Sequence, residues 1–331
     1  MKRIFSLCLI ILFGISLVGC GKNKEVSISF PEKIQSLDSY KLSGKLYTTF
    51  PSGTKECLIT TYYQKPNFYR VEIDNPNMND KQIILKNDNG VHVLIPSLNK
   101  TFMVKSAWPS NSSYPYILES LASDILKDDN KVESTSNDTK IIELSAKMHE
   151  NALPSTQKII FDEKTMNLKE VQVYDENKNL VTRFVVTEYE ENKKLENSIF
   201  NATETLVSVS KIYQDASSNF VREITYPTYF PENTKLEDEL RTGTTANMRS
   251  VIVYSGDTPY TIIESYAFLN ETASTSYLTG SVVVMAENIY VVDTNSVFFY
   301  SQGMEYVVAS NYLSHLEMMK IGESLLVSSE K

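Results

Sequence analysis

The stretch Tyr40–Phe50, which reads YKLSGKLYTTF, decides the fold of the N-terminal half. Every second residue from Tyr40 belongs to a less polar set, and the residues between them form a more polar set. Successive side chains of a β-strand point to opposite sides, so this period of two predicts a strand with one buried face. Phe68–Ile73 alternates in the same way. A sheet with one buried face and one solvent-exposed face is typical of antiparallel strands.

Turn sequences recur at the spacing of β-hairpins. They are Asp88–Gly90, Pro96–Asn99 and Asp175–Lys178, which contain residues that favour tight turns. We therefore predict a mainly antiparallel β fold with a few helices, of the α+β class. The other predicted strands cover residues 141–147, 157–162, 169–174, 181–189, 250–254, 260–267, 281–285, 289–292, 297–300 and 306–310.

Residues Ser112–Lys127 break this rhythm. Their apolar side chains recur at helical spacing, which predicts an amphipathic helix that Ser112 or Ser113 caps and Pro115 begins. The apolar stripe is expected to face the concave side of the sheet, either as permanent core or as a plug that a ligand displaces. The stripe consists of Tyr114, Ile117, Leu118, Leu121 and Ile125.

Prolines interrupt the chain over Ile224–Glu232, and further short strands follow. Ser314–Glu317 has the Ser-x-x-Glu pattern of a capping box, which predicts a final helix. Gly322 lies on the packing face of that helix, where it allows a close approach to a sheet. We therefore predict two domains, a larger one over residues 31–212 and a small C-terminal α+β domain over residues 213–331.

The start of the chain predicts export. Lys2 and Arg3 precede the apolar run Ile4–Val18. As a helix this run would reach roughly 22 Å, which is short of the ~30 Å hydrocarbon core of a membrane. It therefore indicates a signal peptide over residues 1–19 rather than a permanent membrane span.

The sequence LVGC at Leu17–Cys20 matches a bacterial lipobox, in which the cysteine receives a diacylglyceryl group and fatty acids such as palmitate. Residues 20–30 are then the lipidated cysteine and a tether on the extracytoplasmic face of the cell membrane. Cys8 leaves with the signal peptide, so Cys57 remains as the one free thiol. We predict that it is a small buried hydrophobe in a domain without an internal disulfide.

Composition narrows the class of partner. The 331 residues are 42% hydrophobic and 22% charged, as in globular proteins. Asp and Glu total 41 against 32 Lys and Arg, which gives a net charge of −9. Since neutralising phosphates requires Lys and Arg, this acidic balance argues against nucleic acid and favours a basic or apolar partner surface.

Motifs of catalysis and metal binding are missing from the sequence. His92, His149 and His315 do not have the spacing of zinc ligands, and no P-loop, Gly-x-Ser-x-Gly or dinucleotide motif occurs. We therefore predict a protein that is not an enzyme, that binds no metal, and whose only cofactor is the covalent lipid on Cys20.

Two stretches resemble the LolA-like superfamily of outer-membrane lipoprotein carriers. Lys65–Glu72 is similar to its Pro-containing strand with an aromatic-Arg pair, and Asn89–Pro96, followed by Asn99 and Lys100, is similar to its Gly-turn hairpin. The predicted helix occupies the place that the superfamily expects after these strands. The resemblance implies a curved, incomplete β-barrel with helices over an apolar cavity on its concave face.

The rest of the chain resembles a narrower group. The lipobox, Tyr229–Glu232 and His315–Leu325 are similar to the YdcC-type sporulation lipoproteins of Gram-positive spore formers. By the same resemblance the germination lipoprotein GerS is a shorter relative. The resemblance implies a role in sporulation or germination.

Two functions remain open from the sequence. The first is a membrane-anchored, non-enzymatic binding or scaffold module with a protein partner in the cell wall or spore envelope. The second is a carrier or binder of a lipid, an acyl chain or a lipoprotein in the concave cavity. In that case the helical stripe would line the cavity and Trp108 would lie at its mouth. Arg70 would pair with a lipid head group.

Overall fold

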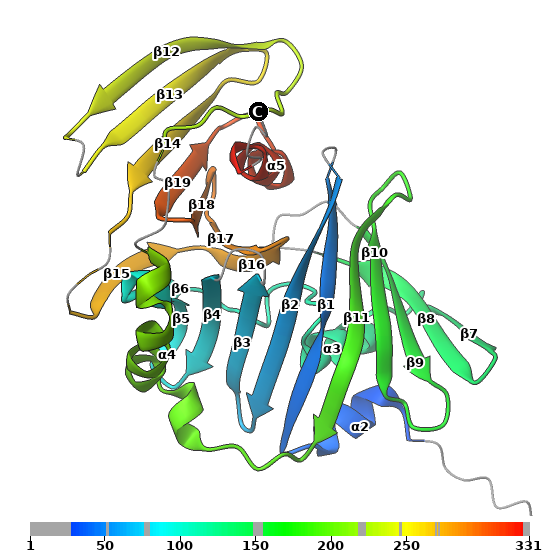
Figure 1. Ribbon diagram of the computed structural model, residues 1–331. Coiled ribbons are helices and arrows are strands. Elements are labelled where there is room, and N and C mark those ends of the chain that lie inside the picture. The colour runs from blue at the N-terminus through cyan, green and yellow to red at the C-terminus, as the bar shows by residue number, and fades with distance from the viewer. Residues whose placement is uncertain are drawn as a thin grey trace, which may run out of the picture.

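The computed structural model describes residues 28–50, 53–75, 80–147, 155–217, 223–244, 247–268, 270 and 272–326. The predicted signal peptide, Cys20, most of the tether and His149 lie outside these residues. No helix of the described residues is both long enough and apolar enough to cross a membrane. Figure 1 shows two sheets, with helices packed against their faces.

Twelve strands of the described residues form the first sheet, in the order β15-β6-β5-β4-β3-β2-β1-β11-β10-β9-β8-β7. All neighbours pair antiparallel except β15 and β6, which are parallel. The sheet is open, since its edge strands are β15 and β7. Its strands are β1 (Ser39–Phe50), β2 (Gly53–Gln64), β3 (Phe68–Asn75), β4 (Asp80–Asn87), β5 (Gly90–Ile95), β6 (Lys100–Lys105), β7 (Val132–Ser136), β8 (Thr139–Ala146), β9 (Ser155–Asp162), β10 (Leu168–Tyr174), β11 (Leu180–Glu191) and β15 (Ser274–Thr279).

Seven described strands form the second sheet, in the order β12-β13-β14-β19-β18-β17-β16, and every pair is antiparallel. The predicted mainly antiparallel α+β architecture is therefore confirmed. The strands are β12 (Thr234–Thr242), β13 (Arg249–Gly256), β14 (Tyr260–Tyr266), β16 (Ser281–Met285), β17 (Asn288–Val292), β18 (Ser296–Ser301) and β19 (Met304–Ala309).

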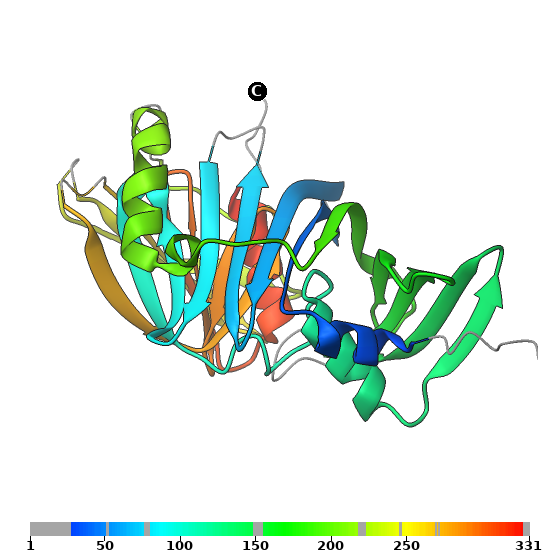
Figure 2. The same cartoon turned by 90° about the horizontal axis from the view of Figure 1, so that it is seen from below.

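Four described α-helices pack on these sheets: α2 (Phe30–Ser36), α3 (Leu118–Lys127), α4 (Ala202–Ser217) and α5 (His315–Leu325). Figure 2 shows that α2 and α3 lie side by side on one face of the curved first sheet, while α4 lies on the other. Two short 3₁₀ turns, η1 (Pro96–Leu98) and η2 (Asn197–Phe200), lie near α4. We call the face that carries α3 the concave face.

The two predicted helices form, with one change of boundary. The capping box at Ser314 starts α5, and Gly322 approaches the ring of Phe299 on β18, as expected. The helix expected from Ser112 instead begins at Leu118 and has no side-chain cap. The Ser113 hydroxyl accepts a hydrogen bond from the backbone N–H of Lys147 (3.1 Å), so it holds the loop to β8 rather than capping a helix.

The second sheet completes the core of the first. One apolar cluster joins the concave face and α3 to residues of β16, β17 and β18, among them Val282, Ile289 and Tyr300. The strand β15, from the C-terminal half, extends the first sheet beside β6. The domain boundary expected after residue 212 falls within α4, which packs on β4, β5 and β6.

Polar contacts connect the two layers at fixed positions. Gln82 of β4 donates from Nε2 to the Tyr300 carbonyl (3.1 Å) and accepts at Oε1 from the Ile289 N–H (3.2 Å). Cys57 of β2 is buried, as predicted, and its thiol donates to the carbonyl of Ala286 (2.8 Å). These contacts set the register between the layers.

An ion pair closes the same interface. The Glu323 side chain of α5 is 3% exposed and lies 2.7 Å from Lys55 Nζ of β2. Its other oxygen accepts hydrogen bonds from Asn288 Nδ2 (3.1 Å) and from the Tyr290 hydroxyl (2.5 Å). A buried carboxylate held by three partners is costly to remove, because its partners are left unsatisfied.

We predict that Glu323→Ala lowers the free energy of unfolding by about 3–5 kcal/mol. The matched change Glu56→Ala removes a carboxylate that pairs with Lys45 at the surface, where each of the two side chains is 42% exposed. We expect this change to lower the free energy of unfolding by less than about 1 kcal/mol. Urea unfolding of both variants measures the two values. Equal losses would contradict this account of the interface.

Candidate functional site

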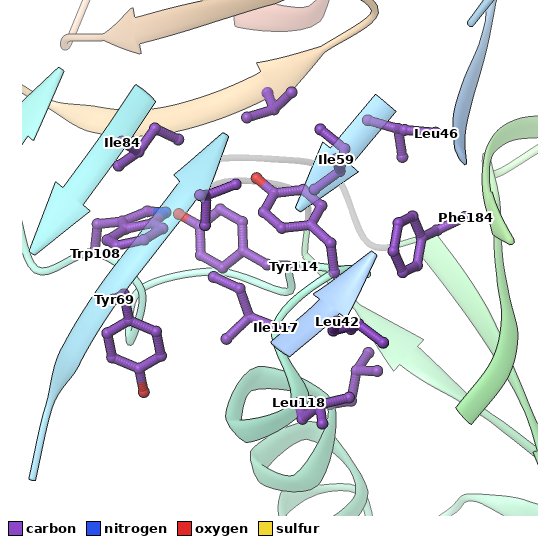
Figure 3. Packing of buried hydrophobic residues seen from close by; sticks show 14 of the residues in the cluster. Leu42, Leu46, Ile59, Tyr69, Ile84, Trp108, Tyr114, Ile117, Leu118 and Phe184 are labelled. Carbon is purple, nitrogen blue, oxygen red and sulfur yellow. The ribbon is translucent and has the colours of Figure 1, made fainter. Parts of the chain in front are cut away.

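The apolar stripe that the sequence predicted is buried, but only Leu118, Leu121 and Ile125 lie on α3, since Tyr114 and Ile117 precede it. Figure 3 shows Tyr114, Ile117 and Leu118 packed among side chains of β1, β2, β3 and β11. The exposed fractions of Tyr114, Ile117, Leu118, Leu121 and Ile125 are 2%, 0%, 1%, 0% and 4%. The concave face is therefore filled by side chains of this chain.

Trp108 lies inside this core and not at an exposed mouth. Its side chain is fully buried, and its ring packs edge-on against Tyr69 (5.7 Å between centroids) and Tyr114 (6.0 Å). The Tyr114 hydroxyl donates to the carbonyl of Val282 on β16 (3.0 Å). Trp108 is thus packed against Tyr114, which is bonded to the second sheet.

Arg70 does not join the other predicted site residues. It follows Tyr69 in β3 and so points to the opposite face of the sheet. There its guanidinium donates to Glu72 (2.8 Å), to the carbonyl of Ile199 (2.9 Å) and to the hydroxyl of Thr205 (2.9 Å). These bonds attach η2 and α4 to the sheet, which is a structural role.

A polar cleft opens beside the filled core. Its volume is about 670 Å³, and it lies between the loop before α3, the polar side of α3, and the end of β8. Most of the lining residues carry hydroxyl, amide or charged groups, and their apolar atoms also face the cleft. The lining residues are Tyr69, Pro109, Ser110, Asn111, Ser112, Ser113, Glu119, Ser120, Ser123, Asp124, Lys127, Asp128, Asp129, Asn130, Ser145, Ala146 and Lys147.

Glu119 is the carboxylate of this cleft that contacts the core. Its Oε2 accepts a hydrogen bond from the Tyr40 hydroxyl (2.8 Å), which in turn accepts one from the backbone N–H of Leu118 (3.2 Å). Its Oε1 is buried and has no hydrogen-bond partner among the described residues. Burial raises the pKa of Glu119 to about 7, because the charged form loses its hydration.

Asp124 lies one turn further along α3. Its carboxylate accepts a hydrogen bond from Gln157 Nε2 of β9 (3.4 Å), and burial raises its pKa to about 6. Sequence reasoning missed Glu119 and Asp124, because charged residues beside an apolar helical stripe are usually solvated. The available signal was their position next to Leu118, Leu121 and Ile125 on a helix that must pack.

Histidine and cysteine side chains do not form a further site in the described part of the chain. No group of three or more His, Cys, Asp or Glu side chains there is placed to hold a metal ion. His92 is buried on the face of β5 opposite to Val91 and Val93, and burial lowers its pKa. Burial raises the pKa of the Cys57 thiol, which makes it a poor nucleophile.

Comparison with known proteins identifies the family to which the chain belongs. The model of the sporulation protein YdcC-like family matches residues 1–200. The chain belongs to this family. It is 28% identical to the sporulation protein YdcC of Bacillus subtilis (strain 168) over 338 residues, with 100% of both chains covered. The resemblance to the YdcC type seen in the sequence is therefore confirmed.

Several solved structures are similar to this YdcC-like protein at low identity. The Pseudomonas aeruginosa MucA/MucB complex matches at 11% identity and a TM-score of 0.30, with 85% of this chain and 91% of that one covered. A LolA superfamily protein from Nitrosomonas europaea matches at 11% identity and a TM-score of 0.30, with 50% of this chain and 91% of that one covered. The structure of the CwlD amidase from Clostridioides difficile in complex with the GerS lipoprotein matches at 13% identity and a TM-score of 0.22. The match covers 50% of this chain and 91% of that one.

We predict that the stripe of α3 behaves as core. Leu121→Ala should lower the free energy of unfolding by about 2–5 kcal/mol, because it leaves a cavity under a fully buried side chain. Leu126→Ala, on the same helix but 69% exposed, should change it by no more than about 0.5 kcal/mol. Chemical denaturation checks both, and a stable Leu121→Ala protein would indicate a loosely held plug.

We also predict a pH-dependent effect of Glu119→Gln. The pKa of Glu119 is about 7 in the folded state against 4.5 ordinarily. The folded state therefore holds an extra proton between these values, and stability falls as the pH rises from about 4.5 through 7. Glutamine keeps the shape without the charge, so at pH 8 it should stabilise by roughly 2–3 kcal/mol, with little effect at pH 4.5.

Thermal unfolding of wild type and Glu119→Gln across this pH range is the measurement. Asp88→Asn, which removes the same charge from the exposed turn between β4 and β5, is the control. A Glu119→Gln advantage that does not change with pH would rule out titration of Glu119 as its cause.

Proposed function

We propose that this YdcC-like protein is a non-enzymatic binding and scaffold module, anchored by lipid on Cys20 to the outer face of the cell membrane. Membership of a sporulation protein family supports a role in spore-envelope assembly or germination. The observation that carries the proposal is the filled concave face, which leaves recognition to the outer surface.

The filled face argues against carriage of an acyl chain. Exposing the five stripe residues, of which three lie on α3 and two precede it, would forfeit about 1.5–3 kcal/mol for each fully buried side chain. The sum approaches the whole stability of a typical domain, about 5–15 kcal/mol. An acyl chain that arrives from a membrane leaves an apolar environment already, so its entry offers little free energy in return.

The tether limits where the module acts. The ten residues after Cys20 reach Phe30, the first residue of α2, and they span at most about 35 Å. Two acyl chains hold a protein on a membrane far more firmly than one. The partner is therefore expected at the membrane or just above it, and an anchored chain of this kind is not expected to shuttle between membranes.

The reactive groups of the interior support a non-enzymatic role. The Cys57 thiol is buried against Ala286, and burial keeps it protonated. Of the two buried carboxylates of α3, Glu119 is bonded to Tyr40 and Asp124 to Gln157. These hydrogen bonds hold both carboxylates in the wall of a binding cleft.

Cys20→Ala tests the anchor. In cell fractionation the wild type should be in the membrane fraction, with an intact mass that includes a diacylglyceryl group on residue 20. The Cys20→Ala chain should lack that mass and either keep its signal peptide or leave the membrane. Cys57→Ala, which removes a thiol without touching the lipobox, is the control, and lipid-free release of the wild type would contradict the proposal.

A further inference from the structure

We infer that the polar cleft beside α3 binds a zwitterionic phosphoethanolamine group, with the ammonium on Glu119 and the phosphate on the lysines and hydroxyls of the lining. This inference deepens the proposed function, since it names the chemistry that the anchored module recognises at the membrane surface.

The shape and lining of the cleft define the class of ligand. Its volume of about 670 Å³ lies within the range of small-molecule sites, ~300–1,000 Å³. Such sites are usually apolar, yet six serines, two asparagines and six charged residues line this one. A lining with this many polar side chains offers hydrogen-bond and ion-pair partners to a small ligand with charged groups.

Glu119 provides the ammonium position. One of its oxygens is bonded to Tyr40, and the other is buried without a partner although the residue lines the cleft. A buried carboxylate oxygen without a donor is costly. A primary ammonium carries three N–H donors and a positive charge, so it both donates to this oxygen and offsets its charge, whereas a neutral hydroxyl only donates.

The rest of the lining provides the phosphate position. Lys127 and Lys147 are both exposed and belong to the cleft, at the end of α3 and after β8. Serine hydroxyls stand beside them in the lining, at Ser123 and Ser145. Ammonium and hydroxyl groups are ordinary donors to phosphate oxygens, and here they must offset the carboxylates of Asp124, Asp128 and Asp129 in the same lining.

The position of the cleft points to the membrane as a source of this group. The helix α2, which follows the tether, packs against α3 (Figure 2). Residues of α3 form a wall of the cleft. The cleft therefore lies beside the helix that follows the predicted tether. At a membrane, phosphoethanolamine is available as a lipid head group, whose phosphodiester carries one negative charge. The free compound keeps the same ammonium, and its phosphate monoester carries close to two negative charges at pH 8.

The test uses residues 21–331, which contain every described residue and the single tryptophan of the chain. Trp108 reports on the cleft because its ring packs against Tyr69, which lines it. At pH 8 we expect phosphoethanolamine to change Trp108 fluorescence saturably. Phosphocholine, whose nitrogen has no N–H, should bind at least tenfold more weakly.

Variants locate the binding. Glu119→Gln should weaken phosphoethanolamine binding at least tenfold while the protein stays folded, and Asp88→Asn should bind as the wild type does. Absence of saturable binding, or equal binding by Glu119→Gln or of phosphocholine, overturns the inference. These measurements are made in solution, so they stand whether or not Cys20 proves to be lipidated.

Vesicles distinguish the two sources. If the head group is recognised in a membrane, vesicles of phosphatidylethanolamine and phosphatidylcholine should sediment the chain more than vesicles of phosphatidylcholine alone, and Glu119→Gln should abolish the difference. Saturable binding of free phosphoethanolamine without any vesicle effect supports the cleft as a site for the soluble compound. Vesicle binding that Glu119→Gln leaves unchanged counts against the cleft.

Discussion

The structure depends on the need to cover one wide apolar face. Twelve strands at about 4.8 Å spacing span roughly 53 Å, whereas the ten residues of α3 make a helix about 15 Å long. With α2 beside it, α3 still leaves much of the concave face uncovered. The strands β16, β17 and β18 cover the remainder, which is why the C-terminal half is part of the core and not an appendage. The polar contacts of Gln82 and Glu323 then fix that layer in register.

Because side chains of the chain itself fill the concave face, a ligand or partner is expected to bind at the outer surface. Trp108 and the five stripe residues are buried on the concave face, so opening an apolar site there would cost the packing of these side chains. The amphipathic character of α3 nonetheless creates a second environment on its polar side. There Glu119 and Asp124 are drawn into partial burial by the same packing that buries Leu121, and their pKa values rise. The helix that closes the core thus also builds the cleft.

Much of the local structure could be predicted from the sequence, and most of the long-range structure could not. Alternation over Tyr40–Phe50 and the capping box at Ser314 depend on neighbours in sequence, so β1 and α5 form as expected. The sequence also allowed a prediction that Arg70 points away from the concave face, because it is next to Tyr69 and adjacent residues of a strand face opposite sides of the sheet. The parallel pair of β15 and β6 joins segments about 170 residues apart, and no local pattern specifies it. Ser113 is a cap by propensity, but its bond to Lys147 outweighs that preference.

The reactivity of Cys57 tests most directly whether the C-terminal layer is a permanent part of the core. In residues 21–331 it is the single thiol, and it is buried at the contact with Ala286. A thiol reagent should modify it only on unfolding, with or without lipid vesicles. A Cys57→Ser, Leu58→Cys chain, whose thiol replaces a side chain that is 37% exposed, should react at once. Rapid modification of Cys57 in the folded protein when lipid is added would show that the layers separate, and would contradict the account.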